Sequence, residues 1–488
     1  MKPLTIQQVR QAVNGRMLTA LPKDAPPPIK SVTSDSKQVE AFSLFVAIRG
    51  EHFDGHAFLP DAAARGACAA LVSRAPEQVL PNLHLIQVED TRRAMGRLAT
   101  FVRGRMQSTV IAVAGSNGKT TTKYLIDAVL SPHLRGTISP KSFNNDIGVP
   151  LAIFPADPQQ DYLVLEIGTN HHGEVKHLAE MALPDLAVIT NVGAEHLEGL
   201  TDLDGVRAEE ASIITGLNPK GCLIVNGDDE PLLSLVSRYP GQRVTFGLKE
   251  TNDLFATDIH CAPDGVRFNL NGSARRRVFV PMLGKHSACN ALAAIAVARK
   301  MGVAEEKIIQ SLAGATGPDM RLQLSKVNGV TVLNDAYNAN PNSTRAAIET
   351  LIALPKGRGG RRVAVLGDML ELGSHSERYH EEIGQLAGSS GLDLLICVGK
   401  KAERIAASAK AVARAARAAR AAGEAGAGAP SEPLQVVTYP DAAAAARAIH
   451  RRVRGKDLVL LKGSRGIGLE AVAKAIEGEK KPAGRAAS

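Results

Sequence analysis

The chain has 488 residues, of which 44% are hydrophobic and 22% charged, a globular composition too long for one hydrophobic core, so we expect about three domains. Seven of the nine net positive charges lie in two Ala/Gly-rich stretches, 400–430 and 478–488, and Trp is absent, which disfavours a nucleic-acid-binding role. The scattered cysteines, the polar N-terminus and the lack of an apolar run of ~20 residues predict a cytoplasmic protein without disulfides, structural zinc, signal peptide or membrane span.

Residues 1–105 contain short apolar stretches, among them Leu44–Ile48 and Leu83–Val88, which Pro and Gly separate. This pattern predicts a small α/β domain. Residues 106–316 alternate apolar runs with helical patterns, which is typical of a mostly parallel sheet with helical crossovers. We expect its strands at Thr109–Ala114, Tyr162–Ile167, Leu186–Thr190 and Cys222–Val225.

Residues 317–488 repeat this alternation and predict a doubly wound, Rossmann-like domain. Within it, Lys401–Ala422 predicts an Ala/Arg helix that runs into a flexible Gly-rich connector, 423–430. We interpret the whole low-complexity stretch, about 401–430, as an insertion without a part in the chemistry, and the C-terminal tail as disordered. The expected strands are Val330–Leu333, Val363–Leu366, Leu392–Val398, Gln435–Val437 and Leu458–Leu461.

A Gly-rich phosphate-loop motif stands between the first strand of the central segment and a predicted helix. Such a loop directs its backbone N–H groups at phosphates beside a helix N-terminus. Lys119 would meet the β- and γ-phosphates, and the Thr120 hydroxyl would hold Mg²⁺. The strict pattern fails at Val113, where a first Gly is expected, but a turn that only joins strand to helix does not explain Gly-Lys-Thr. The motif consists of Gly115, Ser116, Asn117, Gly118, Lys119, Thr120 and Thr121.

Polar residues follow two further strands of the central segment. Glu166 lies at the end of the buried run Tyr162–Ile167, where a carboxylate needs a partner such as Mg²⁺ unless it faces solvent. His196 comes soon after Leu186–Thr190. Ligand sites of open α/β sheets gather at these strand ends, although a single His is by itself more often an ordinary surface or core residue.

The order of these motifs resembles the Mur ligase family over nearly the whole chain. The middle and last domains are most similar to the member that adds a dipeptide, and the D-N-P-R string of the diamino-acid-adding relative is absent from the sequence. The strings that carry the resemblance are Thr33–Ser36, Leu44–Gly50, Phe53–His56, Asn144–Pro150, Glu166–Glu174, Thr190–Gly199, His286–Ala291, Asn334–Pro341, Leu366–Gly373 and Lys462–Arg465.

The resemblance implies a monomeric, ATP-dependent ligase that joins D-alanyl-D-alanine to UDP-N-acetylmuramoyl-tripeptide through an acyl phosphate, in peptidoglycan precursor synthesis. It implies that Lys119, Glu166, His196 and Glu210 are catalytic, and that Thr120, Glu166, His196 and Glu210 bind two Mg²⁺ ions. ATP contacts are implied for the phosphate loop and for Asn290, Arg321, Asp335 and Tyr337. Substrate contacts are implied for Ser34, Asp35, Ser36, Phe45, Asp54, Gly55, His56, Asn144, Asn145, Thr169, Asn170, His171, Asn338, Asn340, Lys462, Ser464 and Arg465.

Glu210 departs from the family, whose members usually carry a carbamylated lysine at the aligned position. A glutamate is anionic without CO₂, so we interpret Glu210 as a replacement for the carbamate at the second Mg²⁺. The alternative is a solvated glutamate on a helix face, with the second metal weakened or lost. Three rival functions stay open: another amino-acid-adding ligase, an inactive ligase-like scaffold, and a nucleic-acid-dependent NTPase that uses the basic stretch.

Overall fold

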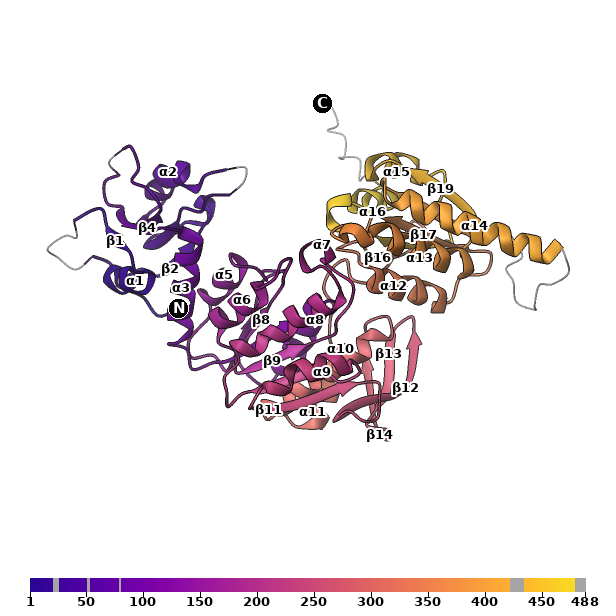
Figure 1. Cartoon of the computed structure of the whole chain (residues 1–488), viewed down its shortest axis with the longest axis horizontal. Coiled ribbons are helices and arrows are strands. Elements are labelled where there is room, and N and C mark those ends of the chain that lie inside the picture. The colour runs from indigo at the N-terminus through magenta and orange to yellow at the C-terminus, as the bar shows by residue number, and fades with distance from the viewer. Residues whose placement is uncertain (21–25, 51–52, 79, 422–433, 479–488) are drawn as a thin grey trace, which may run out of the picture.

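The computed structural model describes residues 1–20, 26–50, 53–78, 80–421 and 434–478. Three sheets follow one another along the chain, and each is covered by helices. The N-terminal part (indigo) and the C-terminal part (orange to yellow) lie on either side of the central part (magenta) in Figure 1. The three-sheet α/β architecture predicted from the sequence is therefore confirmed.

The N-terminal sheet has the order β1-β5-β4-β3-β2, and only β1 is antiparallel to its neighbour. Its strands are β1 (Arg16–Met17), β2 (Ser31–Thr33), β3 (Ser43–Val46), β4 (Ala67–Val72) and β5 (His84–Gln87). One face packs against α1 (Ile6–Val13) and α3 (Thr91–Arg103), and the other against α2 (Leu59–Ala64). Helix α3 also contacts α5 and α6 of the central part, so it joins the two parts.

The central sheet has the order β14-β13-β12-β11-β10-β9-β6-β8-β7 and is parallel from β7 to β12. Strand β6 lies between β8 and β9, and Ala112 pairs with Leu165 on one side and Ala187 on the other. The strands are β6 (Thr109–Ala114), β7 (Gly136–Ile138), β8 (Tyr162–Glu166), β9 (Leu186–Ile189), β10 (Cys222–Asn226), β11 (Gln242–Gly247), β12 (Leu254–Ala262), β13 (Gly265–Leu270) and β14 (Ser273–Val280).

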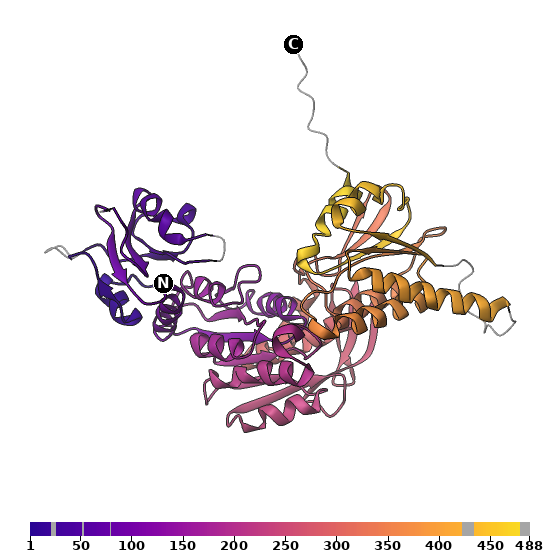
Figure 2. The ribbon, with the colours of Figure 1, turned by 45° about the horizontal axis from the view of Figure 1, so that its top comes forward.

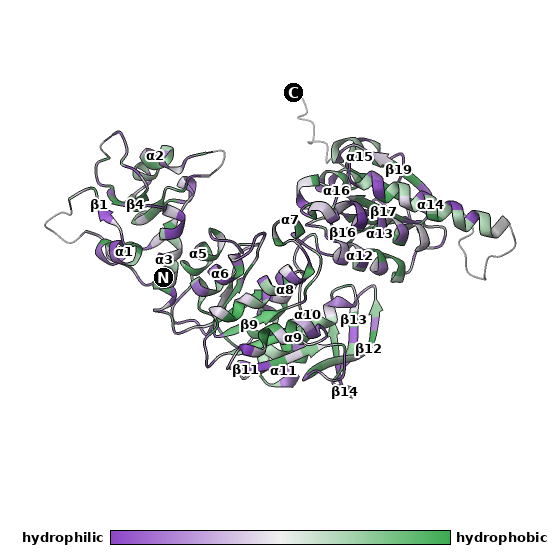
Figure 3. Cartoon of the chain, viewed as in Figure 1, coloured by the Kyte–Doolittle hydropathy of each residue, from purple (hydrophilic) through white to green (hydrophobic). Residues whose placement is uncertain are grey.

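Helices cover both faces of the parallel strands, which explains their continuous apolar runs. One face packs against α4 (Lys119–Leu130), α10 (His286–Lys300) and α11 (Glu305–Ala313). The other packs against α5 (Gly148–Ile153), α6 (Glu174–Ala182), α9 (Glu230–Leu235) and the turn η3 (Ser212–Thr215), which follows α8 (Leu203–Ala211). Strands β12 and β13 pair antiparallel with each other and carry more hydrophilic side chains than the parallel strands do (Figure 3).

The C-terminal sheet has the order β15-β16-β20-β17-β18-β19 and is parallel except for β15. Helices cover its two faces, so it is doubly wound as predicted. The strands are β15 (Gln323–Val327), β16 (Val330–Asp335), β17 (Arg362–Gly367), β18 (Leu394–Val398), β19 (Gln435–Tyr439) and β20 (Leu458–Lys462). The helices are α12 (Pro341–Ala353), α13 (Ser376–Ser389) and α14 (Ala402–Ala421) on one face, and α15 (Ala442–Ile449) and α16 (Glu470–Glu477) on the other.

Helix α14 corrects one expectation about the basic stretch. Its first turns are part of the core, because Ile405 and Ala409 are buried under α13. Only its later part, with exposed Arg414 and Arg417, projects from the body (Figure 2). The predicted connector 423–430 and the tail 479–488 lie outside the described residues. No helix in the described part of the chain is long and apolar enough to cross a bilayer.

Candidate active site

The phosphate loop joins β6 to α4 at the carboxyl ends of the central strands, as its sequence predicts. Gly115 has a φ of +117°, and a Cβ there would lie 2.2 Å from Thr190 Oγ1. Gly118 has a φ of +82°, and its Cβ would lie 2.5 Å from Asn290 Oδ1. Only glycine fits at both positions. The loop is therefore held between the end of β9 and the start of α10.

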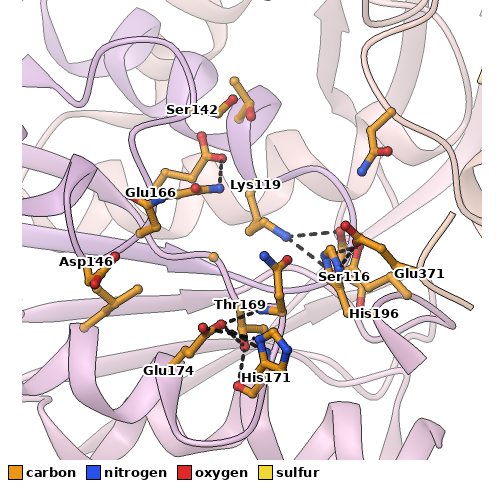
Figure 4. A pocket seen from close by; sticks show the side chains of 18 of the residues that line it. Ser116, Lys119, Ser142, Asp146, Glu166, Thr169, His171, Glu174, His196 and Glu371 are labelled. Carbon is orange, nitrogen blue, oxygen red and sulfur yellow. Dashed lines mark hydrogen bonds and ion pairs between the residues drawn. The ribbon is translucent and has the colours of Figure 1, made fainter. Parts of the chain in front are cut away.

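Lys119 extends from the first turn of α4 into a group of carboxylates (Figure 4). Its Nζ donates hydrogen bonds to Gly115 O at 2.5 Å and Ser116 O at 3.3 Å, and lies 3.5 Å from Glu195 Oε1. Burial lowers the pKa of Lys119, but the charges of Glu195, Glu210 and Glu166 outweigh it and raise the pKa above its ordinary value. The side chain therefore stays a cation in a mostly buried place.

Glu166 ends β8 and is 1% exposed. Its Oε2 lies 3.1 Å from the Nζ of Lys123, and its Oε1 accepts a hydrogen bond of 3.2 Å from Asn144 Nδ2. Lys123 is itself fully buried and donates to Ser139 O at 2.9 Å and to Lys141 O. We did not predict Lys123 as a site residue, although its place four residues after Lys119 puts both on one face of α4.

His196 adopts a left-handed conformation at the start of α7 (Leu197–Leu200). Its Nδ1 lies 2.5 Å from Glu371 Oε2, and its Nε2 lies 3.9 Å from Glu195 Oε2. Burial lowers the pKa of His196, but the hydrogen bond with Glu371 and the charge of Glu195 outweigh it and raise the pKa overall. Glu195 and Glu371 stood in the motifs but were not predicted as site residues.

Side chains of the C-terminal part reach the phosphate loop. Asn340 Nδ2 donates to Asn117 Oδ1 at 2.8 Å and to Glu195 Oε2 at 3.3 Å. Arg321 donates to Thr120 Oγ1 at 3.2 Å, and its guanidinium lies 4.3 Å from the Tyr337 ring centre. Residues that the sequence separates by more than 200 positions thus meet at one loop.

Lys462 connects two other predicted residues beside the loop. Its Nζ lies 2.6 Å from Asp335 Oδ2 and donates to Asn338 O at 2.8 Å. Arg465 lies over the Tyr337 ring, 5.6 Å from its centre. Ser464 is buried and accepts a hydrogen bond of 2.9 Å from Leu370 N. The predicted residues of the C-terminal part therefore form one connected group.

Two cavities lie on either side of the phosphate loop. The larger, about 1280 Å³, opens between all three parts of the chain, and the smaller, about 730 Å³, lies between α10 and the C-terminal part. Predicted residues that line the larger cavity are Ser116, Asn117, Gly118, Lys119, Thr120, Asn144, Asn145, Glu166, Thr169, Asn170, His171, His196, Arg321, Tyr337, Asn338, Asn340, Lys462, Ser464 and Arg465. Those that line the smaller are Asn117, Gly118, Thr121, Asn290, Arg321, Asp335 and Lys462.

The predicted N-terminal residues are not brought into this site. None of Ser34, Asp35, Ser36, Phe45, Asp54, Gly55 and His56 is among the described residues that line either cavity. Phe45 is 1% exposed in the core, and His56 hydrogen-bonds Asp54 and Ser73. Instead α3 supplies Arg92, Arg93 and Arg97 to the larger cavity. We missed these arginines because no motif contains them.

Three family models match successive parts of the chain: "Mur ligase family, catalytic domain" at residues 28–103, "Mur ligase middle domain" at 113–298, and "Mur ligase, glutamate ligase domain" at 320–465. A relative from Bacillus subtilis, UDP-N-acetylmuramoyl-tripeptide--D-alanyl-D-alanine ligase, is 36% identical over 96% of this chain and 97% of its own length. The chain belongs to the Mur ligase family. The Escherichia coli ligase of the same name is also 36% identical, over 82% of this chain and 87% of its own.

Solved structures of Mur ligases have the same fold. MurF from Acinetobacter baumannii aligns with a TM-score of 0.83 at 30% identity, over 97% of this chain and 98% of its own. MurF ligase from Thermotoga maritima, in complex with ADP, aligns with a TM-score of 0.77 at 27% identity, over 92% and 97% of the two chains. The predicted family membership is therefore confirmed, and the likeness extends over all three parts.

Glu210 lies behind the phosphate loop of this Mur ligase rather than on a cavity wall. It is 1% exposed, and its Oε2 accepts a hydrogen bond of 2.7 Å from Gly115 N. Burial raises the pKa of Glu210 to about 7, although Lys119 partly opposes the shift. Neither Glu210 nor Gly115 is among the described residues that line the two cavities. The glutamate is thus placed to hold the loop.

The buried Glu210 carboxylate makes the stability of this Mur ligase depend on pH. Because its pKa rises from an ordinary 4.5 to about 7 in the folded state, its contribution to stability is present below pH 4.5 and is lost as pH rises through 7. Glu210→Gln keeps an acceptor for Gly115 N and removes the titration. We expect the free energy of unfolding of this variant, relative to the unmodified protein, to increase by about 2.5 kcal/mol between pH 5 and pH 8.

Urea unfolding at both pH values measures this difference. Asp204→Asn, on the same helix but with an exposed side chain, is the control and should show a pH-independent difference. A Glu210→Gln curve that runs parallel to that of the unmodified protein from pH 5 to pH 8 would contradict the prediction.

Proposed function

We propose that this chain joins D-alanyl-D-alanine to UDP-N-acetylmuramoyl-tripeptide and cleaves ATP to ADP and phosphate. The names of the Bacillus subtilis and Escherichia coli relatives support this assignment, and the ADP complex of the Thermotoga maritima structure supports the use of an adenine nucleotide. The observation that carries it is a Lys119 cation on the wall of the cavity that opens to all three parts of the chain, next to Asn117 and Gly118, which line both cavities. We place the reaction in the cytoplasm, where ATP and nucleotide-linked precursors occur.

The proposed reaction has two steps. The terminal carboxylate of the tripeptide attacks the γ-phosphorus of ATP, which forms an acyl phosphate and releases ADP. The amine of D-alanyl-D-alanine then attacks the acyl carbon, loses a proton, and displaces phosphate as the amide forms. Lys119 and the N–H groups of the phosphate loop hold the transferred phosphoryl group and balance its charge, which is most of what phosphoryl transfer requires of a protein.

The residues around Lys119 fit Mg²⁺. Glu166 Oε2 and Glu195 Oε1 are buried, and each lies beside one lysine ammonium, at 3.1 Å from Lys123 and 3.5 Å from Lys119. The Thr120 hydroxyl lines the same cavity as both glutamates. Within the described part of the chain, no group of three or more His, Cys, Asp or Glu side chains is arranged to hold a metal ion by itself. Mg²⁺, however, usually takes only one or two carboxylates and completes its coordination shell with phosphate oxygens and water. When bound, Mg²⁺ would neutralise phosphate charge.

We propose that Thr120 and Glu166 hold one Mg²⁺ ion, and that Glu195 and His196 stand closest to a second. Glu210 would act through Gly115 and through its charge on Lys119, rather than as a ligand. The smaller cavity would take the adenosine of ATP, beside Asn290 and Asp335. The larger would take the peptide end of the precursor and the dipeptide, beside Thr169–His171 and Asn338.

We also propose the domain limits 1–105, 106–316 and 317–488. The N-terminal domain would hold the uridine nucleotide, and α3 would present Arg93 and Arg97 toward its diphosphate. Both cavities have walls from the central and the C-terminal parts. We therefore expect these two parts to close toward each other when substrates bind.

Phosphate release from ATP and Mg²⁺ tests the proposed function. We expect release only when UDP-N-acetylmuramoyl-tripeptide and D-alanyl-D-alanine are both present, with one phosphate per pentapeptide formed. Parallel reactions contain the dipeptide precursor with a diamino acid, or single-stranded nucleic acid alone. Release with the diamino acid would assign the chain to a sister ligase, and release with nucleic acid would replace the proposal with a nucleic-acid-dependent NTPase.

A further inference from the structure

The last turn of α8 carries two adjacent buried carboxylates. Glu209 is 4% exposed and Glu210 is 1% exposed. Successive side chains on an α-helix point about 100° apart, so the two carboxylates leave α8 in different directions. Glu210 reaches the phosphate loop at Gly115, and Glu209 reaches the segment that precedes α6.

Both oxygens of Glu209 accept backbone hydrogen bonds. Oε2 accepts from Gly173 N and Oε1 from Val175 N, each at 2.7 Å, and Thr169 Oγ1 approaches Oε1 at 3.4 Å. The first N–H groups of a helix have no partner within the helix. A carboxylate that satisfies two of them is favoured further by the helix dipole. Glu209 therefore fixes the start of α6 from a different helix.

The segment 169–174 is held from within by a second carboxylate. Glu174 Oε2 accepts hydrogen bonds from Asn170 N at 2.6 Å and His171 N at 3.0 Å. Figure 4 shows Glu174 beside Thr169 and His171 on the wall of the larger cavity. Since Glu174 starts α6, it moves with that helix, whereas Glu209 hydrogen-bonds the segment from α8.

Helix α8 is in turn fixed to both neighbours. The turn η3, which directly follows α8, packs against α6, and α8 packs against α9. Ala211 and Ile213 are buried in the same core as α6. Because Glu209 and Glu210 lie on the same helical turn, that turn fixes the position of segment 169–174 relative to the phosphate loop.

We propose that Glu209 is a positioning residue for the acceptor substrate: it places the segment 169–174 against the phosphate loop that Glu210 holds. The inference rests on the proposed function, because that function gives Thr169–His171 the peptide end of the precursor. Glu209 does not itself line either cavity in the described part of the chain, so it acts only through the segment.

Substitution by glutamine should have different effects on the hydrogen bonds of Glu209 and Glu210. A glutamine has one acceptor oxygen and one donor group. At position 209 its amide would face Gly173 N–H or Val175 N–H, and two donors would oppose each other. At position 210 the single accepted bond from Gly115 N would remain. The same substitution therefore removes a hydrogen bond to segment 169–174 at position 209 but keeps the hydrogen bond to the phosphate loop at position 210.

Steady-state kinetics of Glu209→Gln in the full-length protein test the proposal. We expect the KM for UDP-N-acetylmuramoyl-tripeptide to rise about tenfold, because a charged hydrogen bond at the wall is lost, while kcat and the KM for ATP stay within about twofold. If Glu209 only stabilised the fold, the substitution would reduce the fraction of active protein and therefore kcat, and both KM values would stay unchanged. Glu210→Gln should leave the tripeptide KM unchanged, and Asp204→Asn, with an exposed carboxylate on α8, should leave every parameter unchanged.

Amide hydrogen exchange, measured without substrates, separates this inference from the proposed function. Glu209→Gln should speed exchange about tenfold or more at Gly173 or at Val175, whichever N–H then faces the amide, and Glu210→Gln should not. The exchange measurement tests the role of Glu209 even if the ligase reaction is not observed. Glu209→Asp keeps both acceptors on a shorter arm and should show the same pattern, more weakly, should the glutamine variant fail to fold. Unchanged exchange at both amides, or equal rises in the two KM values, would overturn the proposal.

Discussion

Lys119→Ala is expected to lower kcat for phosphate release roughly 10³-fold. Lys119 is a cation on the wall of the larger cavity, and its Nζ already lies beside Gly115 O, Ser116 O and Glu195. Its charge matters most when negative charge moves between the phosphoryl oxygens, so the loss should fall on kcat more than on nucleotide affinity. Lys119→Arg should not restore the rate, because a planar guanidinium cannot replace a compact ammonium there.

Two controls keep this result from being confused with unfolding. Removal of Lys119 leaves Glu195, Glu210 and Glu166 without their shared cation, so activity is measured well below the thermal transition of the variant. Titration with ADP shows whether the nucleotide still binds. Lys176→Ala, on an exposed ion pair of α6, should keep full activity. More than a tenth of the original kcat in Lys119→Ala would refute the proposed role of Lys119.

The buried strands of the fold were predictable because helices cover both faces of them. Expected strands such as Thr109–Ala114 and Leu458–Leu461 match β6 and β20 to within one residue. Strands β12–β14 and β15 were missed because many of their side chains alternate or face solvent, whereas the expected strand Val330–Leu333 lies within β16. The early turns of α14 were assigned to an insertion because composition hides the buried Ile405 among alanines.

The site was predictable where a motif follows a strand. Parallel strands bring their carboxyl ends to one edge, so the phosphate loop, Glu166 and His196 were expected together and lie on one cavity. The ion-pair partners of these residues were not predictable. Lys123 and Glu371 contact Glu166 and His196 only because separate helices and loops fold against them. Phe45 belongs to an intact motif and its side chain lies in the core, so its substrate contact stays a prediction.

Lys123→Met is expected to lower the free energy of unfolding by about 3–5 kcal/mol, because it leaves Glu166 as a buried and uncompensated charge. The ammonium lies 3.1 Å from Glu166 Oε2 and also satisfies the carbonyls of Ser139 and Lys141. Urea unfolding measures the change, and Lys176→Met is the exposed control, with an expected loss of about 0.5 kcal/mol or less.

The double variant Lys123→Met/Glu166→Gln decides whether the pair or the packing of Lys123 carries this energy. Removal of both charges leaves neither member of the pair as a buried ion without its partner, so the double variant should be more stable than Lys123→Met alone, although Glu166→Gln should abolish catalysis by itself. Strictly additive losses would contradict the pair as the cause. If Glu166 also binds Mg²⁺, millimolar Mg²⁺ should stabilise Lys123→Met more than the double variant, because a divalent cation can then neutralise the carboxylate that lost its lysine.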